Sequence, residues 1–330
     1  MTVSVENREA AFPIPVVDIS QYLEDPRSSE ADRVVEIIRH ACETSGIFEV
    51  TGHGIPIELQ DRVFEATKAV FNLPADEKLK LSGKPGRGYE VYGNEVREAD
   101  TRPDVREGYF VGRQLPGMNN QFRPFGEPNI WPDPKILPET KFRQPMLEYL
   151  DAVTDLSFHL MQILARGLPQ LDTRVIAEFC RDPIAAIRPL RYPSQPKDSA
   201  VVGTGAHTDF GAITLLLQDG NSGLQAFDPS QNAWVEVPSR RDGLVVNVGD
   251  MLQTWTNGAY KSNTHRVINT SGSDRYSVPF FLDGNSDCVL RPLDGSSDGD
   301  ACTVEEHMLK ILCVLLAAVR RQNLMPDLSR

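Results

Sequence analysis

The stretch Thr204-Gly-Ala-His-Thr-Asp-Phe-Gly-Ala-Ile-Thr-Leu-Leu-Leu217 places an imidazole and a carboxylate directly before an apolar run. The run favours a β-strand because apolar and β-branched residues fill it. On an extended strand, residues two positions apart project from the same face. His207 and Asp209 are therefore predicted to lie side by side, with Thr208 pointing the other way.

A third candidate ligand is His265, in the strand-like run Tyr260-Lys-Ser-Asn-Thr-His-Arg-Val-Ile268. Two His and one carboxylate on one face of a metal, with the other positions open, are the ligand set of non-haem Fe(II) oxygenases. Each residue alone is more often an ordinary hydrogen-bonded side chain, and zinc hydrolases use similar ligands. The three together predict a metal site without choosing the metal.

The segment Arg275-Tyr-Ser277 follows His265 on another predicted strand. A guanidinium is a planar fork that pairs bidentately with a carboxylate, and a hydroxyl two residues on can add a third hydrogen bond. Taken alone, Arg275 is by default interpreted as a surface Arg with an ion-pair partner.

Taken together, His207, Asp209, His265, Arg275 and Ser277 resemble the 2-oxoglutarate/Fe(II)-dependent dioxygenases of the isopenicillin N synthase-like type. The resemblance implies that the first three bind iron. It also implies that Arg275 and Ser277, with the Tyr192 phenol, bind the distal carboxylate of 2-oxoglutarate. Many plant members have Asn two positions before that Tyr, where this chain has Leu190, so one contact is unmatched.

The implied activity is oxidation of an unactivated C–H bond of a small-molecule metabolite, by hydroxylation, desaturation or ring rearrangement. Fe(II), 2-oxoglutarate and O2 are the implied cofactor and cosubstrates, succinate and CO2 the co-products, and ascorbate a candidate reductant. Secondary metabolism is the expected setting. Two alternatives stay open: a 2-oxoglutarate-independent iron oxidase of the same fold, and a non-catalytic metal-binding or small-molecule-binding module.

By the same resemblance, the substrate pocket lies at the open mouth of a barrel. Singly, the strand aromatics among its residues fit a half-buried packing role equally well. The residues expected there are Arg87, Asn94, Tyr109, Phe110, Phe210 and Phe281. Two other histidines, His53 between two glycines and His159 in a helical stripe, are interpreted as structural.

The pattern along the chain predicts helices first and strands later. Helical spacing follows Ser28 up to Gly46, recurs from Glu58 to Phe71, and fills Glu139 to Leu168. From Ile187 on, short β-rich runs separated by turn signals predict an antiparallel sandwich or barrel. These runs are 187–192, 200–206, 212–217, 223–227, 233–237, 243–248, 263–268, 275–282 and 287–290.

With the resemblance, the fold class becomes mixed α+β: a double-stranded β-helix, or jelly roll, flanked by N-terminal and long central helices. We expect one domain over 1–330, with a helix-rich part at 12–180, a jelly-roll core at 187–295 and a C-terminal helix at 303–325. The segment after Thr303-Val-Glu-Glu-His307 departs from the family pattern. A buried helix, a dimer-contact helix and an altered C-terminus are the alternatives, and His307 is expected to face solvent.

Charge, cysteine content and apolar runs limit which partners and which cellular compartment are expected. The formal net charge of −12 over 330 residues argues against nucleic acid or an anionic membrane as a partner. Five scattered cysteines predict reduced thiols in a cytoplasmic protein. The N-terminus lacks the apolar run of a signal peptide, and the apolar run 311–319 is too short for a membrane span. A small-molecule substrate and a monomer or weak homodimer are expected.

Overall fold

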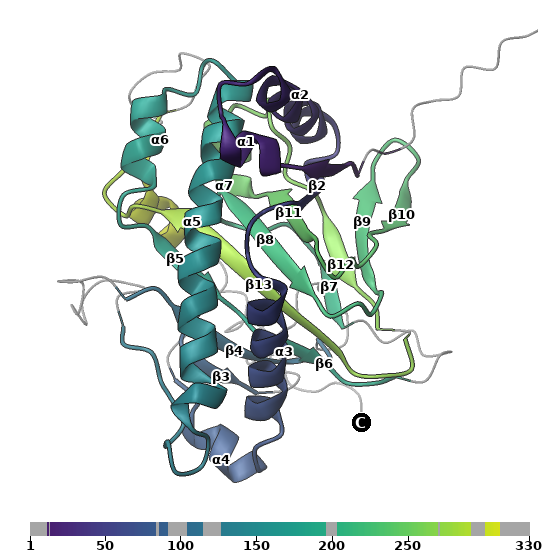
Figure 1. Cartoon of the computed structure of the whole chain (residues 1–330), viewed down its shortest axis with the longest axis vertical. Coiled ribbons are helices and arrows are strands. Elements are labelled where there is room, and N and C mark those ends of the chain that lie inside the picture. The colour runs from purple at the N-terminus through teal and green to yellow at the C-terminus, as the bar shows by residue number, and fades with distance from the viewer. Residues whose placement is uncertain are drawn as a thin grey trace, which may run out of the picture.

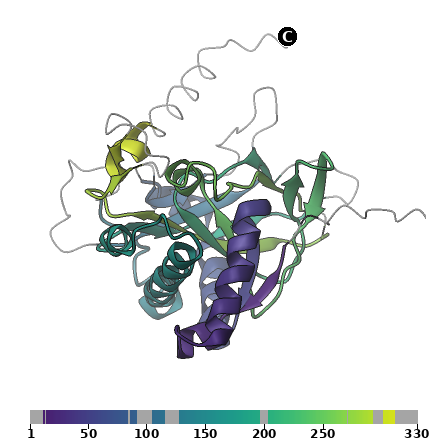
Figure 2. The same ribbon diagram turned by 90° about the horizontal axis from the view of Figure 1, so that it is seen from above.

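A computed structural model of the chain describes residues 12, 14–83, 86–91, 104–114, 127–195, 203–269, 271–291 and 301–310. Helices cover one face of a large sheet, and a smaller sheet lies away from the longest helix in both views (Figures 1 and 2). The predicted fold class, mixed α+β with a jelly roll flanked by helices, is confirmed.

The large sheet has nine strands and carries the strand of Arg275 near its middle. Its order is β1 (Val16–Asp18), β2 (Ile47–Thr51), β11 (Leu244–Val248), β8 (Ile213–Gln218), β13 (Arg275–Gly284), β5 (Ile184–Ile187), β4 (Glu107–Gly112) and β3 (Gly88–Glu90), with β6 (Leu190–Tyr192) pairing with β13 and β4. The expected strand 187–192 is thus split into β5 and β6. The break falls at Pro189, which has no N–H to donate to a ladder.

The smaller sheet brings two metal-ligand segments together. Its order is β10 (Ala233–Glu236), β9 (Leu224–Asp228), β12 (His265–Val267) and β7 (Thr204–His207), and a separate pair joins β14 (Val289–Leu290) to β15 (Cys302–Thr303). The antiparallel register sets His265 opposite His207. Segments that are far apart in sequence therefore meet at one sheet position.

The described helices include α1 (Ser20–Glu24), α2 (Ser29–Thr44), α3 (Ile57–Phe71), α4 (Ala75–Lys80), the short 3-10 turn η1 (Glu139–Lys141), α5 (Arg143–Gly167), α6 (Thr173–Phe179) and α7 (Asp250–Trp255). Two of these, α2 and α6, begin at a side-chain cap. The Ser28 hydroxyl caps α2 by accepting from the Ala31 amide at 3.1 Å. Gly46, at φ +70°, follows the end of that helix, as the sequence predicts.

The two faces of β13 point to different parts of the molecule. Tyr276, Val278, Phe280 and Leu282 belong to the large apolar core shared with the helices, including α5. Alternation along the strand turns Arg275, Ser277 and Phe281 to the opposite face, toward the inside of the barrel. A smaller cluster closes the space between the two sheets and includes Tyr192, Ala226, Val245 and Val267.

The C-terminal helix expected at 303–325 is described from 304 to 310, and the rest of that range lies outside the described residues. His307 in this helix is half-buried, so the expectation that it faces solvent is wrong. It lies beside the Phe210 backbone, and burial lowers its pKa. Across the described residues, no helix is long and apolar enough to cross a membrane.

Candidate metal centre

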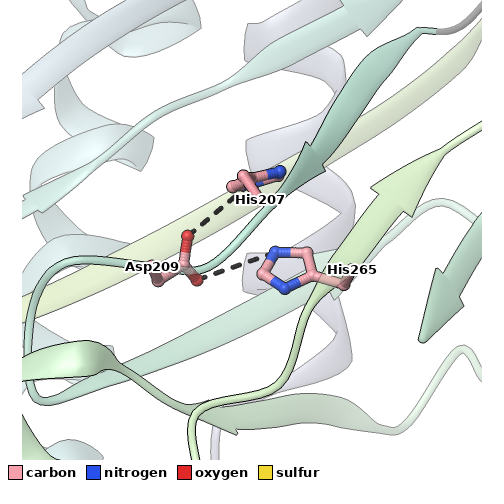
Figure 3. A group of neighbouring side chains, drawn as sticks. All are labelled: His207, Asp209 and His265. Atoms are coloured by element: carbon pink, nitrogen blue, oxygen red, sulfur yellow. Dashed lines mark ion pairs between the residues drawn. The ribbon is translucent and has the colours of Figure 1, made fainter. Parts of the chain in front are cut away.

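Three side chains converge where β7 ends and β12 begins (Figure 3). The distance from His207 Nε2 to Asp209 Oδ1 is 3.7 Å, and from His265 Nε2 to Asp209 Oδ2 it is 3.8 Å. These distances are too long for hydrogen bonds. All three ligand atoms lie within 4.8 Å of one another. Metal–ligand bonds of about 2.0–2.2 Å place two ligand atoms up to about 4 Å apart, so one ion can bridge Asp209 and either imidazole at the separations observed.

Asp209 reaches this position differently from the sequence expectation. The strand ends at His207, and Asp209 lies in the turn that follows it. The turn is fixed because the Asp250 amide at the start of α7 donates to the Asp209 carbonyl at 2.7 Å. The Thr208 hydroxyl, pointing away from the ligands, donates to Asp250 Oδ2 at 2.8 Å.

Both imidazoles are oriented by backbone carbonyls. His207 Nδ1 lies 2.8 Å from the Gly205 carbonyl oxygen, and His265 Nδ1 lies 3.1 Å from the Asn263 carbonyl oxygen. A carbonyl can only accept, so Nδ1 carries the proton and Nε2 turns its lone pair toward the centre. The donor set therefore fits a divalent metal ion.

The Asp209 carboxylate is held by two polar residues that the sequence reasoning missed. Thr214 Oγ1 donates to Asp209 Oδ2 at 2.6 Å, and Asn247 Nδ2 donates to the same oxygen at 2.9 Å. Their signal is a polar side chain inside an apolar strand, in Ile213-Thr-Leu-Leu-Leu217 and in Leu244-Val-Val-Asn-Val248. A lone polar residue in such a run needs a partner when it is buried.

A second buried group of side chains gathers around Arg275, whose exposed fraction is 0%. Its Nη1 donates to Ser277 Oγ at 3.3 Å, and its Cζ lies 5.1 Å from the centre of the Tyr192 ring. The structure thus brings together the three residues expected to hold 2-oxoglutarate. It adds Gln218, which sequence reasoning missed and whose Oε1 accepts from Arg275 Nη2 at 2.8 Å.

The residues expected to line a substrate pocket are placed unequally. Phe281 shares the inner face of β13 with Arg275 and Ser277, and Phe210 is half-buried in the turn after Asp209. Phe110 lies under the Arg188 guanidinium, whose Cζ is 4.7 Å from the ring centre.

The other three residues expected in the pocket have no described contact with the metal ligands or with the residues around Arg275. Tyr109, the neighbour of Phe110, packs on the opposite face of β4 against Phe142, and its hydroxyl donates to the Ile130 carbonyl at 2.6 Å. Arg87 donates from Nε to the Glu127 carbonyl at 2.9 Å and from Nη1 to the Gly86 carbonyl at 2.7 Å. Asn94 lies outside the described residues.

A buried carboxyl near the centre was also missed from sequence. Asp283 lies close to Gly211, in the turn that follows Asp209. Burial, and secondarily the Asp209 carboxylate, raise the pKa of Asp283 to about 7. A register shift between Leu282 and Gly284 sets Asp283 at a bulge in β13, and bulges often redirect side chains beside active sites.

Comparison with known proteins gives the family. Residues 14–134 match the N-terminal family of non-haem dioxygenases in morphine synthesis, and residues 180–284 match the 2OG-Fe(II) oxygenase superfamily. The 2-oxoglutarate-dependent dioxygenase citB of Monascus ruber is 42% identical over 92% of this chain and 95% of its own length. This chain belongs to the 2-oxoglutarate/Fe(II) oxygenase superfamily. The predicted family is confirmed.

Other similar proteins agree over nearly the full length. Clavatol oxidase claD of Penicillium crustosum is 39% identical over 90% of this chain and 95% of its own. The crystal structure of a full-length Neurospora crassa protein in complex with alpha-KG matches with a TM-score of 0.78 and 26% identity, over 91% and 96% of the two chains.

This oxygenase is a 2-oxoglutarate-dependent dioxygenase that uses Fe(II), with His207, Asp209 and His265 as the metal ligands. The predicted enzyme class and cofactors are confirmed, and the binding-module and 2-oxoglutarate-independent alternatives are set aside.

Proposed function

We propose that the enzyme oxidises an unactivated C–H bond of a small organic metabolite, and that Arg275, Ser277 and Tyr192 bind the distal carboxylate of 2-oxoglutarate. The observation that carries this assignment is a fully buried guanidinium beside a hydroxyl and a phenol ring. Burying an unpaired charge is costly, so such a group is retained where an anion will meet it. The chain's similarity to fungal 2-oxoglutarate-dependent dioxygenases, one of them a clavatol oxidase, supports a secondary metabolite as the substrate.

The residues of the site have different roles in this reaction. Iron bound by the facial triad supplies the oxidising chemistry with O2 and 2-oxoglutarate, giving succinate and CO2 as co-products. His207, Asp209 and His265 would hold the iron, and the Gly205 and Asn263 carbonyls keep both imidazoles in one orientation. Phe110, Phe210 and Phe281 are the apolar residues proposed to hold the substrate and exclude water. Arg87, Asn94 and Tyr109 stay predictions.

The assignment is tested by anaerobic titration of the metal-free protein with Fe(II) and then 2-oxoglutarate, following the visible charge-transfer band. The wild type is expected to give the band, and Asp209→Ala is expected to lose iron binding. Arg275→Ala should bind iron but lose the band. Arg174→Ala, which changes an exposed Arg paired with Asp172, is the control and should behave as wild type. A band of wild-type strength in Arg275→Ala would overturn the 2-oxoglutarate assignment.

We infer that the chain forms one domain and acts as a monomer or weak homodimer in the cytoplasm. Among the described residues, large exposed apolar side chains are few and widely separated in sequence, such as Val16, Leu79 and Val289. The four described cysteines are free thiols, which supports a reducing compartment. Light scattering coupled to size exclusion tests the oligomeric state: a tight dimer would contradict the inference.

A further inference from the structure

The charge of Arg275 is not balanced by a carboxylate within the described part of the chain. Its guanidinium forms no ion pair there, and its Nε is buried without a hydrogen-bond partner. The carboxylate of Asp219, which acts on it electrostatically, accepts hydrogen bonds from the β13 backbone and from its own loop. Asp219 Oδ2 accepts from the Tyr276 amide at 2.7 Å and from Asn221 Nδ2 at 3.0 Å. A buried cation in this state attracts an anionic ligand.

Gln218 supplies a neutral acceptor to this cation. It ends β8, pairs with Ser277 of β13 and is 3% exposed. Its Oε1 accepts from Arg275 Nη2 at 2.8 Å, while its Nε2 donates to the Pro238 carbonyl at 3.4 Å. The Pro238 carbonyl can only accept, so it determines which end of the amide faces Arg275. The amide therefore fixes the guanidinium without neutralising it.

We propose that Gln218 is a positioning residue that orients Arg275 for 2-oxoglutarate while leaving its positive charge available. The inference rests on the proposed function, in which Arg275 binds the distal carboxylate. A carboxylate at position 218 would have nearly the same shape, but it would form an internal ion pair and compete with the cosubstrate. The neutrality of the side chain at position 218 is thus a determinant of cosubstrate affinity.

The test uses two substitutions that separate charge from packing. Gln218→Glu keeps the shape and adds a charge. We expect at least a ~100-fold rise in the Kd for 2-oxoglutarate, since a charged hydrogen-bonded pair must be broken for binding. Gln218→Met keeps the volume and removes the acceptor, and should raise that Kd by about 10-fold. The Kd is measured by calorimetry on the Fe(II)-loaded protein without O2.

Stability distinguishes this role from a merely structural one. In the absence of 2-oxoglutarate, Gln218→Glu should melt at or above the wild-type temperature, because Arg275 gains an ionic partner. Gln218→Met should melt below it. At a 2-oxoglutarate concentration of about ten times the wild-type Kd, the melting temperature should rise for the wild type and hardly change for Gln218→Glu, because ligand stabilisation depends on the ratio of concentration to Kd. In turnover, the KM for 2-oxoglutarate should rise more than kcat falls.

A matched pair on the neighbouring sheet provides the control. Gln225 lies on β9 and Arg266 on β12, and Gln225 Oε1 accepts from Arg266 Nε at 2.8 Å. Gln225→Glu should leave the Kd for 2-oxoglutarate within about twofold of wild type, since a partly exposed pair has little effect at a distance.

The outcomes separate this inference from the proposed function. Wild-type 2-oxoglutarate affinity in Gln218→Glu, beside lost affinity in Arg275→Ala, would overturn the role of Gln218 alone. Wild-type affinity in Arg275→Ala would overturn the proposed function and the inference with it. If Gln218→Glu fails to fold while Gln218→Met folds and keeps full affinity, position 218 has only a packing role and the inference is wrong.

Discussion

At the scale of single residues, the metal ligands depend on neighbours that never touch the metal. Asp209 is the common partner of both imidazoles, and Thr214 and Asn247 donate to the same oxygen of its carboxylate. Hydrogen bonds of this kind fix the direction in which a ligand presents its lone pairs. Affinity for iron is therefore shared between the triad and the strands behind it.

Thr214→Val removes the 2.6 Å hydrogen bond to Asp209 while keeping the side-chain shape. We expect Fe(II) affinity to fall by about 10- to 100-fold, the usual cost of losing such a partner. An anaerobic Fe(II) titration measures it. Thr154→Val is the control, because its buried hydroxyl donates to the Leu150 carbonyl within α5, away from the centre. Equal affinities in the two variants would contradict the prediction.

His53 makes a pH-dependent contribution to stability that is independent of the metal. Burial lowers the pKa of His53 from its ordinary value of 6.5, with Asp242 partly opposing this, and Nδ1 accepts from the Ile55 amide at 3.1 Å. The folded state thus binds fewer protons than the unfolded chain as the pH falls through this range. The His53 contribution is present above pH 6.5 and is lost as the pH falls toward the lowered pKa.

His53→Asn removes the titrating group and keeps an acceptor for the Ile55 amide. The difference in unfolding free energy between wild type and variant should shrink by about 1 kcal/mol from pH 7 to pH 5. Urea denaturation of the metal-free proteins at both pH values measures it. A difference that does not change with pH would contradict the prediction, because it would show that His53 has the same pKa in the folded and unfolded states.

At the scale of elements, one buried carboxylate connects the N-terminal segments to the barrel. Glu107 of β4 accepts from Lys78 Nζ of α4 at 2.6 Å and from the Tyr89 hydroxyl of β3 at 2.7 Å. Its other oxygen accepts from Arg191 Nη1 of β6 at 3.1 Å. Three elements thus meet at one side chain that is 5% exposed.

Glu107→Gln should lower the free energy of unfolding by about 3 kcal/mol, because it leaves the half-buried Lys78 ammonium without its anion and weakens the contact with Arg191, which keeps Asp274. Chemical denaturation measures the loss. Glu148→Gln is the control: it breaks the exposed ion pair with Arg62, and should cost less than about 1 kcal/mol. The prediction fails if the two losses are the same size.

At the scale of the whole molecule, the end of α2 contacts the segment that carries the third metal ligand. The Lys261 amide donates to the Cys42 carbonyl at 2.8 Å, and Asn263 Nδ2 donates to the Ser45 carbonyl at 2.9 Å. Asn263 also supplies the carbonyl that orients His265. An N-terminal helix therefore helps to position a ligand of the barrel.

Gly46→Ala tests this connection. A Cβ at Gly46 would lie 1.9 Å from the Lys261 carbonyl oxygen, so the segment must move. We expect a loss of at least about 3 kcal/mol in stability, and Fe(II) affinity about 10-fold weaker. Gly54→Ala is the matched control, since Gly54 has a similar φ of +79° but nothing within 4 Å. It should cost about 1 kcal/mol and leave iron affinity unchanged. Similar iron affinities in both variants would refute the coupling.

The amino-acid sequence by itself determined the family, the three metal ligands, the Arg275 and Ser277 pair, and most helix and strand positions. The helix and strand positions follow from periodicity and capping residues, which act between near neighbours in the chain. The family, the metal ligands and the Arg275 and Ser277 pair follow from the resemblance of their residue types and spacing to the oxygenase family. The Ser28 to Gly46 helix and the β-rich second half were predicted for this reason.

Only the tertiary structure decided which polar residues support the site and which aromatic residues face it. Thr214, Asn247 and Gln218 have partners on other strands or beyond a turn, and strand pairing register is set by the whole sheet. Tyr109 and Phe110 look alike in sequence, yet the alternation of β4 sends them to opposite faces. His307 is half-buried because a distant turn packs against its helix, a contact that no local pattern encodes.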